Sequence, residues 1–170
     1  MMKRRGFTLT EMLVVLAIIG TLAGIGIPVT RSMLAKSRQA GCLTQLRSLG
    51  VGLESYLQDN NRKMPTWAMG RASKTDDAAV LETELLPYVE SPEAFKCPQD
   101  SVFYQKTGSS YFWNPTQNDL PESQLSFFGI EDRPDKIPLI SDKEPWHPGG
   151  TNFLYADFSG SSKLRFVAGN

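Results

Sequence analysis

The fold of this chain is decided by residues 7–28 near its N-terminus, which read FTLTEMLVVLAIIGTLAGIGIP. Up to Ile27, Glu11 is the only charged side chain in this stretch. A helix of this length rises about 30 Å at roughly 1.5 Å per residue, which matches the hydrocarbon core of one bilayer. The stretch therefore predicts a helix that can cross a membrane once.

Glu11 separates three interpretations of the stretch. A secretory signal peptide fits the basic start, MMKRRG at residues 1–6, but it gains nothing from a carboxylate in its apolar region. A plain single-pass anchor leaves the carboxylate equally unexplained. Because a charge at membrane depth costs at least ~2.5 kcal/mol on insertion scales, the third interpretation is a segment in which Glu11 meets a cationic partner.

Residues 3–11, KRRGFTLTE, indicate what that partner is. They resemble the leader and cleavage motif of the type IV prepilin superfamily. The resemblance implies that prepilin peptidase removes the leader after Gly6 and N-methylates the new N-terminal residue, Phe7. It also implies assembly roles for Glu11, the fifth residue of the mature chain, and for Pro28, which interrupts the helix.

Cleavage would create a free α-amine at Phe7, a cation that Glu11 of a neighbouring subunit can meet. In a low dielectric the two charges neutralise each other, whereas a lone buried charge is strongly unfavourable. We therefore expect this pair to favour registered assembly of subunits over an isolated subunit.

Charge alone does not orient the helix in a membrane. Basic side chains precede it at residues 3–5 and follow it at residues 31–38, so the positive-inside rule gives nearly a tie. The resemblance implies a single-pass inner-membrane protein with a cytoplasmic N-terminus and a periplasmic C-terminal domain, which then enters a pilus or pseudopilus. It implies prepilin peptidase, other pilin or pseudopilin subunits and the inner-membrane assembly platform as partners.

After Pro28 the pattern becomes amphipathic. Apolar side chains recur at spacings of four and three residues, at Cys42, Leu46, Leu49, Leu53 and Tyr56. This spacing predicts one helical stripe, which we expect the C-terminal domain to cover. Pro28 itself removes a backbone hydrogen bond and kinks a helix, and a role in loosening the helix during extraction from the membrane stays open beside this structural role.

The C-terminal part contains shorter apolar runs. Residues 81–89 predict a short helix or turn that ends at Pro87. Strand-like segments follow at 110–113, 137–141, 151–156 and 162–167, of which the last two predict a hairpin. A small antiparallel sheet packed on the helical stripe would bury both surfaces, so we expect an α+β, pilin-like fold. Its parts are a leader (1–6), a transmembrane and assembly half-helix (7–28), an amphipathic half-helix (29–60) and a globular domain (61–170).

Residues 147–157, HPGGTNFLYAD, resemble the H-X9-DG motif of many prepilin-like proteins from some outer-membraned bacteria. Phe158 stands where that group usually has Gly, so we expect the turn after Asp157 to differ. We expect His147 and Asp157 to hydrogen-bond loop backbone at the edge of the sheet. A hydrolase built from these two residues and Ser159 is not expected, because the sequence contains no nucleophile elbow or oxyanion loop.

The two cysteines, Cys42 and Cys97, are candidates for a disulfide if the C-terminal domain is periplasmic. Closing this loop of about 55 residues would stabilise the fold by ~4 kcal/mol in the chain-entropy model. Alternatively, Cys42 is only a small buried residue of the stripe. Zinc is not expected, because His147 and two cysteines so far apart in the sequence do not supply the four close ligands of a structural site.

Calcium is the one cofactor that we keep as a candidate, and otherwise we expect none. Asp142, Glu144 and Asp157 lie in predicted loops that could converge, and calcium takes carboxylate and carbonyl oxygens. The major pseudopilins of type II secretion, which the chain resembles, carry calcium in their C-terminal loops. The sequence has no EF-hand spacing.

The resemblance to prepilins implies a structural protein and not an enzyme. Lys plus Arg and Asp plus Glu both number 18, so no global charge favours nucleic acid as a partner. We expect a structural subunit of a type IV pilus-like or type II secretion pseudopilus filament. A single-pass, membrane-anchored periplasmic binding or sensor module and an exported enzyme are the alternatives. The sequence does not separate a surface pilus, a secretion pseudopilus and a DNA-uptake system.

Overall fold

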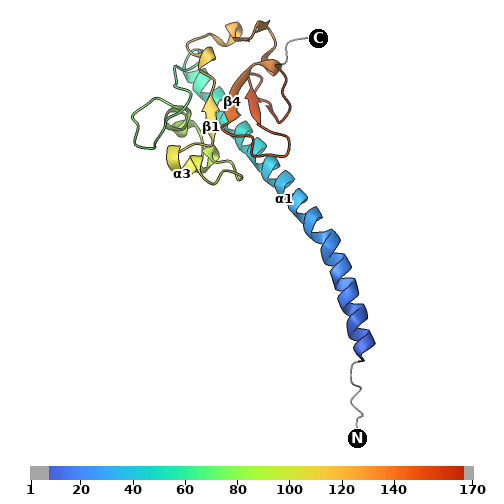
Figure 1. Ribbon diagram of the computed structural model, residues 1–170. Coiled ribbons are helices and arrows are strands. Elements are labelled where there is room, and N and C mark those ends of the chain that lie inside the picture. The colour runs from blue at the N-terminus through green and yellow to red at the C-terminus, as the bar shows by residue number, and fades with distance from the viewer. Residues whose placement is uncertain (1–7, 167–170) are drawn as a thin grey trace. The chain divides into compact units, whose positions relative to one another are not determined.

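The computed structural model describes residues 8–166 (Figure 1). By its contacts the chain forms two compact units, Met1–Lys36 and Ser37–Asn170. The predicted leader, with the cleavage-site residue Gly6, and the methylation-site residue Phe7 lie outside the described residues.

Helix α1 spans Leu9–Asp59, with Pro28 inside it. The helix predicted over residues 7–60 is thereby confirmed over its described part. Among residues 8–166, α1 is the one helix that is long and apolar enough to cross a membrane. In the first unit the large apolar side chains of residues 9–34 are all exposed, by 44 to 82%.

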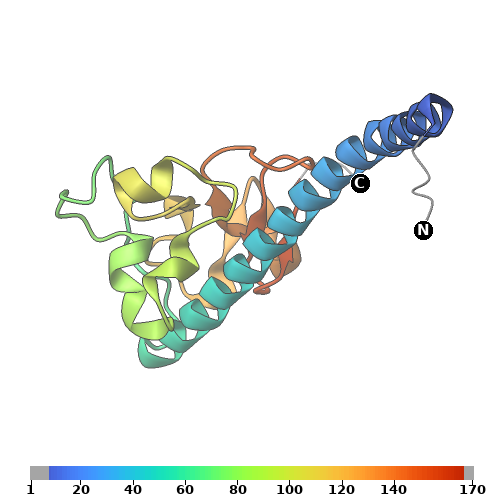
Figure 2. The ribbon, with the colours of Figure 1, turned by 90° about the horizontal axis from the view of Figure 1, so that it is seen from below.

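The sheet of the second unit has four antiparallel strands in the order β1-β4-β5-β6. These strands are β1 (Tyr111–Trp113), β4 (Pro138–Asp142), β5 (Phe153–Tyr155) and β6 (Gly160–Ser161). A separate two-stranded sheet pairs β2 (Ser126–Phe127) with β3 (Ile130–Glu131). In Figures 1 and 2 the four-stranded sheet lies against the part of α1 that belongs to this unit.

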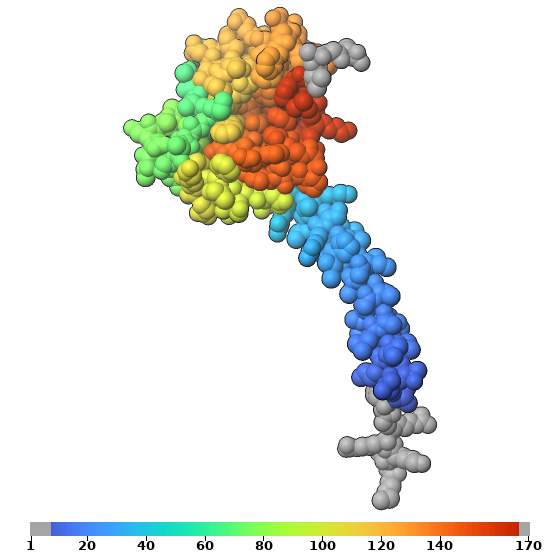
Figure 3. Space-filling view, in the orientation of Figure 1, coloured from blue at the N-terminus to red at the C-terminus, as the bar shows by residue number. Residues whose placement is uncertain are grey.

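Short helical segments fill the connections of this unit. They are α2 (Leu81–Glu84), η1 (Leu86–Tyr88), η2 (Pro92–Phe95), α3 (Phe103–Thr107), η3 (Pro115–Gln117), η4 (Glu122–Gln124) and η5 (Pro134–Lys136). The first two confirm the short helix predicted at residues 81–89. The space-filling view shows these connections packed beside the C-terminal strands, which are orange to red (Figure 3).

The core of the second unit is built on the predicted stripe of α1. Four of the five residues predicted for the stripe are fully buried, namely Cys42, Leu46, Leu49 and Leu53. Leu57, which was not among the five, is fully buried as well. The fifth, Tyr56, is only half-buried and meets the rings of Trp67 and Tyr88 edge-on. The stripe packs against side chains of the sheet, including Tyr111, Trp113, Ile140 and Leu154.

Two glycines let other segments approach α1 closely. A Cβ on Gly52 would lie 2.8 Å from Cγ1 of Val89, and a Cβ on Gly50 would lie 3.1 Å from Cδ1 of Leu154. Contacts shorter than normal van der Waals separations force repacking of a dense core. Gly at these positions therefore permits the close packing of the helix.

The strand predicted at residues 162–167 is wrong over residues 162–166, the part that the structure describes, because the hairpin closes earlier than expected. The backbone turns at Phe158, where φ is +59°, and the N–H of Tyr155 donates to the carbonyl of Ser159. The returning strand β6 is therefore Gly160–Ser161. Beyond it, the hydroxyl of Tyr155 donates to the carbonyl of Lys163 and accepts from the N–H of Arg165, so a side chain takes the place of a neighbouring strand.

Candidate functional site

Glu11 takes part in a capping box at the start of α1. Its carboxylate oxygen Oε2 accepts hydrogen bonds from the backbone N–H and the hydroxyl of Thr8, at 2.8 and 2.9 Å. In return, the N–H of Glu11 donates to Oγ1 of Thr8 at 3.2 Å. This reciprocal arrangement satisfies donors that an α-helix leaves free at its N-terminus. The sequence carries the signal, Thr-x-x-Glu at residues 8–11, which we did not use.

Around Pro28 the first unit contains glycines that packing within the chain does not explain. A Cβ added to Gly20, Gly24 or Gly26 would meet no atom within 4 Å. The side chains near them are exposed and apolar. Small residues in an apolar helix typically mark the places where other helices approach. The assembly role expected for Pro28 and Glu11 stays a prediction, as do the cleavage and methylation expected at Gly6 and Phe7.

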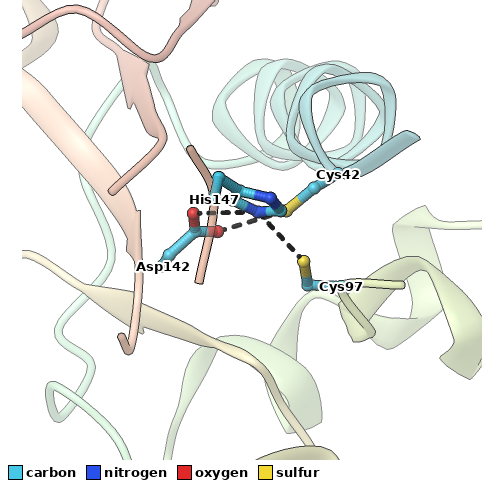
Figure 4. Close-up of side chains that lie close together, drawn as sticks. All are labelled: Cys42, Cys97, Asp142 and His147. Atoms are coloured by element: carbon cyan, nitrogen blue, oxygen red, sulfur yellow. Dashed lines mark hydrogen bonds and ion pairs between the residues drawn. The ribbon is translucent and has the colours of Figure 1, made fainter. Parts of the chain in front are cut away.

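A second candidate site lies inside the second unit, where four chemically reactive side chains converge (Figure 4). Ligand atoms of Cys42, Cys97, Asp142 and His147 all lie within 4.8 Å of one another, and all four residues are buried. Cys42 Sγ lies 3.2 Å from Asp142 Oδ1, and Cys97 Sγ lies 3.3 Å from His147 Nε2. Nε2 of His147 also lies 3.5 Å from Asp142 Oδ2.

The helix and the sheet position two members of this cluster. Cys42 is the first residue of the buried stripe of α1. Asp142 ends β4, where its N–H donates to the carbonyl of Asn152 and its Oδ2 accepts from the N–H of Asn152. The hydroxyl of Tyr111, the residue paired with Asp142 across β1 and β4, lies 3.3 Å from Cys42 Sγ.

Two turns position the other two members. The N–H of Cys97 donates to the hydroxyl of Ser110, which in turn donates to the carboxylate of Asp100 at 2.6 Å. The same carboxylate accepts backbone N–H bonds at the start of α3, so the turn that carries Cys97 is anchored at both ends. The turn that carries His147 closes with a bond from the N–H of Gly150 to the His147 carbonyl.

Burial controls the charge of these groups. It raises the pKa of Asp142 to about 6 and lowers the pKa of His147. The pKa of the Cys42 thiol lies above its ordinary value because of its hydrogen bond with Cys97 and its burial. Among residues 8–166, His147 is the only basic side chain within ion-pair distance of Asp142.

The structure groups the predicted site residues differently from the disulfide and calcium hypotheses. Cys42 and Cys97 are both free thiols that lie close together, and the disulfide expected between them stays a prediction. Separation in the sequence is one reason not to expect zinc, but the two cysteines and His147 lie close together in the folded chain. Asp142, which the calcium hypothesis groups with Glu144 and Asp157, instead supplies the fourth possible ligand atom of this cluster.

The three residues of the calcium hypothesis do not come together. Asp142 is buried in the cluster, whereas Glu144 and Asp157 are exposed. The carboxylate of Asp157 accepts from the N–H of Ser159, which is the loop-backbone contact expected of it. The ring of His147 contacts Cys97 and Asp142 instead of loop backbone.

A long N-terminal helix that packs its second half on a small antiparallel sheet defines the pilin-like class of α+β proteins, as the sequence predicts. Comparison with known proteins agrees with this class. Residues 1–27 match the family model described as the prokaryotic N-terminal methylation motif. No solved structure matches the chain significantly.

Three relatives indicate more closely which proteins the chain is similar to. It is 30% identical to the type II secretion system core protein G of Klebsiella pneumoniae over 143 residues, which cover 84% of this chain and 93% of that protein. Over 60 residues it is 40% identical to the type IV major pilin protein PilA of Myxococcus xanthus, covering 35% of this chain and 27% of PilA. Over 62 residues it is 39% identical to the type IV major fimbrial protein FimA of Dichelobacter nodosus, covering 36% of this chain and 39% of FimA.

The chain belongs to the type IV prepilin and pseudopilin superfamily. The matches to the two pilins span about a quarter to two fifths of their own length. The names of two of these relatives describe pilus or fimbrial subunits, and the name of the third describes a core protein of a secretion system.

Proposed function

We propose that this chain is cut between Gly6 and Phe7 by prepilin peptidase, methylated at Phe7, and polymerised through the first half of α1. The product would be a type IV pilus-like or type II secretion pseudopilus filament. The observation that carries this proposal is the exposed apolar surface of residues 9–34, which holds a single acidic side chain at Glu11. Exposed apolar surface of this extent indicates a membrane or protein contact.

The capping box supports the proposed role of Glu11. Thr8 holds the carboxylate at the first turn of the helix, which in the mature chain lies close to the N-terminal amine in sequence. The two hydrogen bonds from Thr8 orient the carboxylate but bring no positive charge. A neighbouring subunit's amine at Phe7 would supply that charge, and the pair would set the axial register between subunits.

The glycines of the first unit support close packing between subunits. Gly20, Gly24 and Gly26 have open space around them within the chain. Small residues let helix backbones approach closely where side-chain packing, and not exclusion of water, drives association. We propose that the first halves of α1 helices from several subunits pack through this segment.

Before assembly, the same half-helix would anchor the chain in the inner membrane. We propose a cytoplasmic N-terminus, because prepilin processing requires the leader to reach the peptidase, and a periplasmic second unit. The inner-membrane assembly platform would then extract the subunit. The similarity to core protein G, which extends over 84% of this chain, favours a secretion pseudopilus over a surface pilus.

Coexpression with a prepilin peptidase and the rest of an assembly system tests the proposal. We expect the purified filament to contain chains that begin with N-methylated Phe7, read by mass spectrometry of the N-terminal peptide. Glu11→Ala should be processed normally but should lower the yield of filaments at least tenfold. Glu90→Gln, which removes an exposed carboxylate of the second unit, is the matched control and should assemble like the original chain.

Two results would count against the proposal. An unprocessed chain that stays in the membrane fraction would favour the single-pass binding or sensor module. Filaments of unchanged yield from Glu11→Ala would remove the charge pair from the account.

A further inference from the structure

The cluster of Cys42, Cys97, Asp142 and His147 is a site that filament assembly does not use. It combines two thiols, an imidazole and a carboxylate, which are the three kinds of ligand that zinc takes in proteins. We propose that these four side chains bind one zinc ion inside the second unit. The inference is independent of whether the chain builds a pilus or a pseudopilus.

The distances within the cluster suit a tetrahedral ion. With Zn–S bonds of about 2.3 Å and Zn–N and Zn–O bonds of about 2.0–2.2 Å, the ligand atoms of a tetrahedral site lie roughly 3.3–3.8 Å apart. Cys97 Sγ lies 3.3 Å from His147 Nε2, and Asp142 offers two oxygens, Oδ1 at 3.2 Å from Cys42 Sγ and Oδ2 at 3.5 Å from His147 Nε2. One ligand atom from each of the four residues lies within 4.8 Å of the others. Small side-chain movements are sufficient to centre an ion among them.

The charges around the cluster also favour a cation. Asp142 is buried, and in the described part of the chain its one basic neighbour is His147. Thiols are weak hydrogen-bond donors, so the contact from Cys42 to Asp142 compensates poorly for burying a carboxylate. When Zn²⁺ binds, the two thiols lose their protons to solvent and the ion bonds to both thiolates, the carboxylate and the neutral imidazole.

Neighbouring donors can take up the negative charge that remains. Two thiolates and one carboxylate exceed the charge of Zn²⁺ by one. The backbone N–H of Asn152 donates to Asp142 Oδ2 at 2.8 Å, and the hydroxyl of Tyr111 lies 3.3 Å from Cys42 Sγ, where it can donate to the thiolate. Such outer contacts orient the ligands of metal sites and stabilise their charge.

The site would be structural. Four protein ligands leave no open position for water or substrate, and the cluster is closed to solvent. Thiolate and imidazole ligands suit zinc, whereas calcium requires oxygen ligands. The ion would tie together α1, the turn at Cys97, the end of β4 and the turn at His147, and would thereby hold the sheet on the helix.

The test uses the full chain, purified in detergent micelles under anaerobic conditions without chelators, from cells grown with added zinc. We expect one zinc per chain by elemental analysis. Replacement by Co²⁺ should give the visible bands of a tetrahedral site and a near-ultraviolet thiolate-to-cobalt charge-transfer band. Cys97→Ser and His147→Gln should lower the zinc content at least tenfold. Glu144→Gln, which removes an exposed carboxylate and leaves all four ligands in place, should retain one zinc.

Three results would overturn the proposal. The first is an original chain that binds neither zinc nor Co²⁺. The second is zinc that stays at one per chain in Cys97→Ser and His147→Gln, which would make it an adventitious ion only. The third is a chain isolated with Cys42 and Cys97 joined in a disulfide, without any metal. If the variants fail to fold, the Co²⁺ spectrum of the original chain still decides, because a missing thiolate band excludes the two cysteines as ligands.

Discussion

In the first unit, the large apolar side chains of α1 at residues 9–34 are exposed. In the second unit, the same helix has five fully buried apolar residues: Cys42, Leu46, Leu49, Leu53 and Leu57. One half of the helix is completed by its own chain, through the sheet and the short helices. The other half needs a membrane or other subunits to cover it. We therefore expect that stability of the subunit and assembly of the filament depend on different residues of one helix.

Truncation of the buried stripe should have the largest effect on the subunit itself. Leu49→Ala should lower the free energy of unfolding of the second unit by about 2–5 kcal/mol, because Leu49 is fully buried and its removal leaves a cavity. Chemical unfolding in detergent micelles, followed by the fluorescence of the buried Trp67 and Trp113, measures this change.

The matched variant for Leu49→Ala is Leu13→Ala in the exposed half. Leu13 is 62% exposed, so unfolding of the second unit should change by less than about 0.5 kcal/mol, while the yield of filaments falls. Equal destabilisation of the second unit by both variants would break the comparison between the two halves.

Addition of a methyl group to a glycine should also distinguish the two halves of α1, with a smaller effect on the free energy of unfolding. Gly52→Ala should destabilise the second unit by about 1–3 kcal/mol, because the new Cβ would lie 2.8 Å from Val89 Cγ1. In Gly24→Ala the new Cβ meets nothing within 4 Å, so the isolated subunit should unfold as before. A difference in melting temperature between the two variants, measured by circular dichroism, checks this, and a stable Gly52→Ala would contradict the tight packing.

Loss of the capping box should have the smallest effect. Thr8→Ala removes the hydroxyl that bonds Glu11 and should destabilise the first turn of α1 by about 1 kcal/mol. Amide hydrogen exchange of residues 9–12 in micelles should become faster, while the exchange of the buried stripe stays the same. Unchanged exchange in the first turn would show that the cap does not hold Glu11.

Much of the fold could be predicted from periodicity. The apolar run, the stripe after Pro28 and the residues of β1, β4 and β5 follow from local pattern, because each repeats along one element. The prediction of the last strand failed because the hydroxyl of Tyr155 hydrogen-bonds the backbone of residues 163 and 165. The alternation of apolar and polar residues along a segment does not predict such a contact between a side chain and backbone farther along the chain.

The buried cluster could not be predicted for a related reason. Cys42, Cys97, Asp142 and His147 come from a helix, a strand end and two turns, and only the folded chain brings them together. The separation of these residues in the sequence argues against a shared metal ion, but folding brings their side chains close together. The N-terminal motif, by contrast, is continuous in sequence, so roles for Gly6, Phe7 and Glu11 could be predicted without a structure.

The most direct test of the account is the structure of the purified filament at a resolution that shows side chains. We expect the N-terminal amine at Phe7 of one subunit to lie within about 4 Å of the Glu11 carboxylate of a neighbour, the distance of an ion pair. A filament in which Glu11 contacts only Thr8 of its own chain, with no amine near it, would contradict the account.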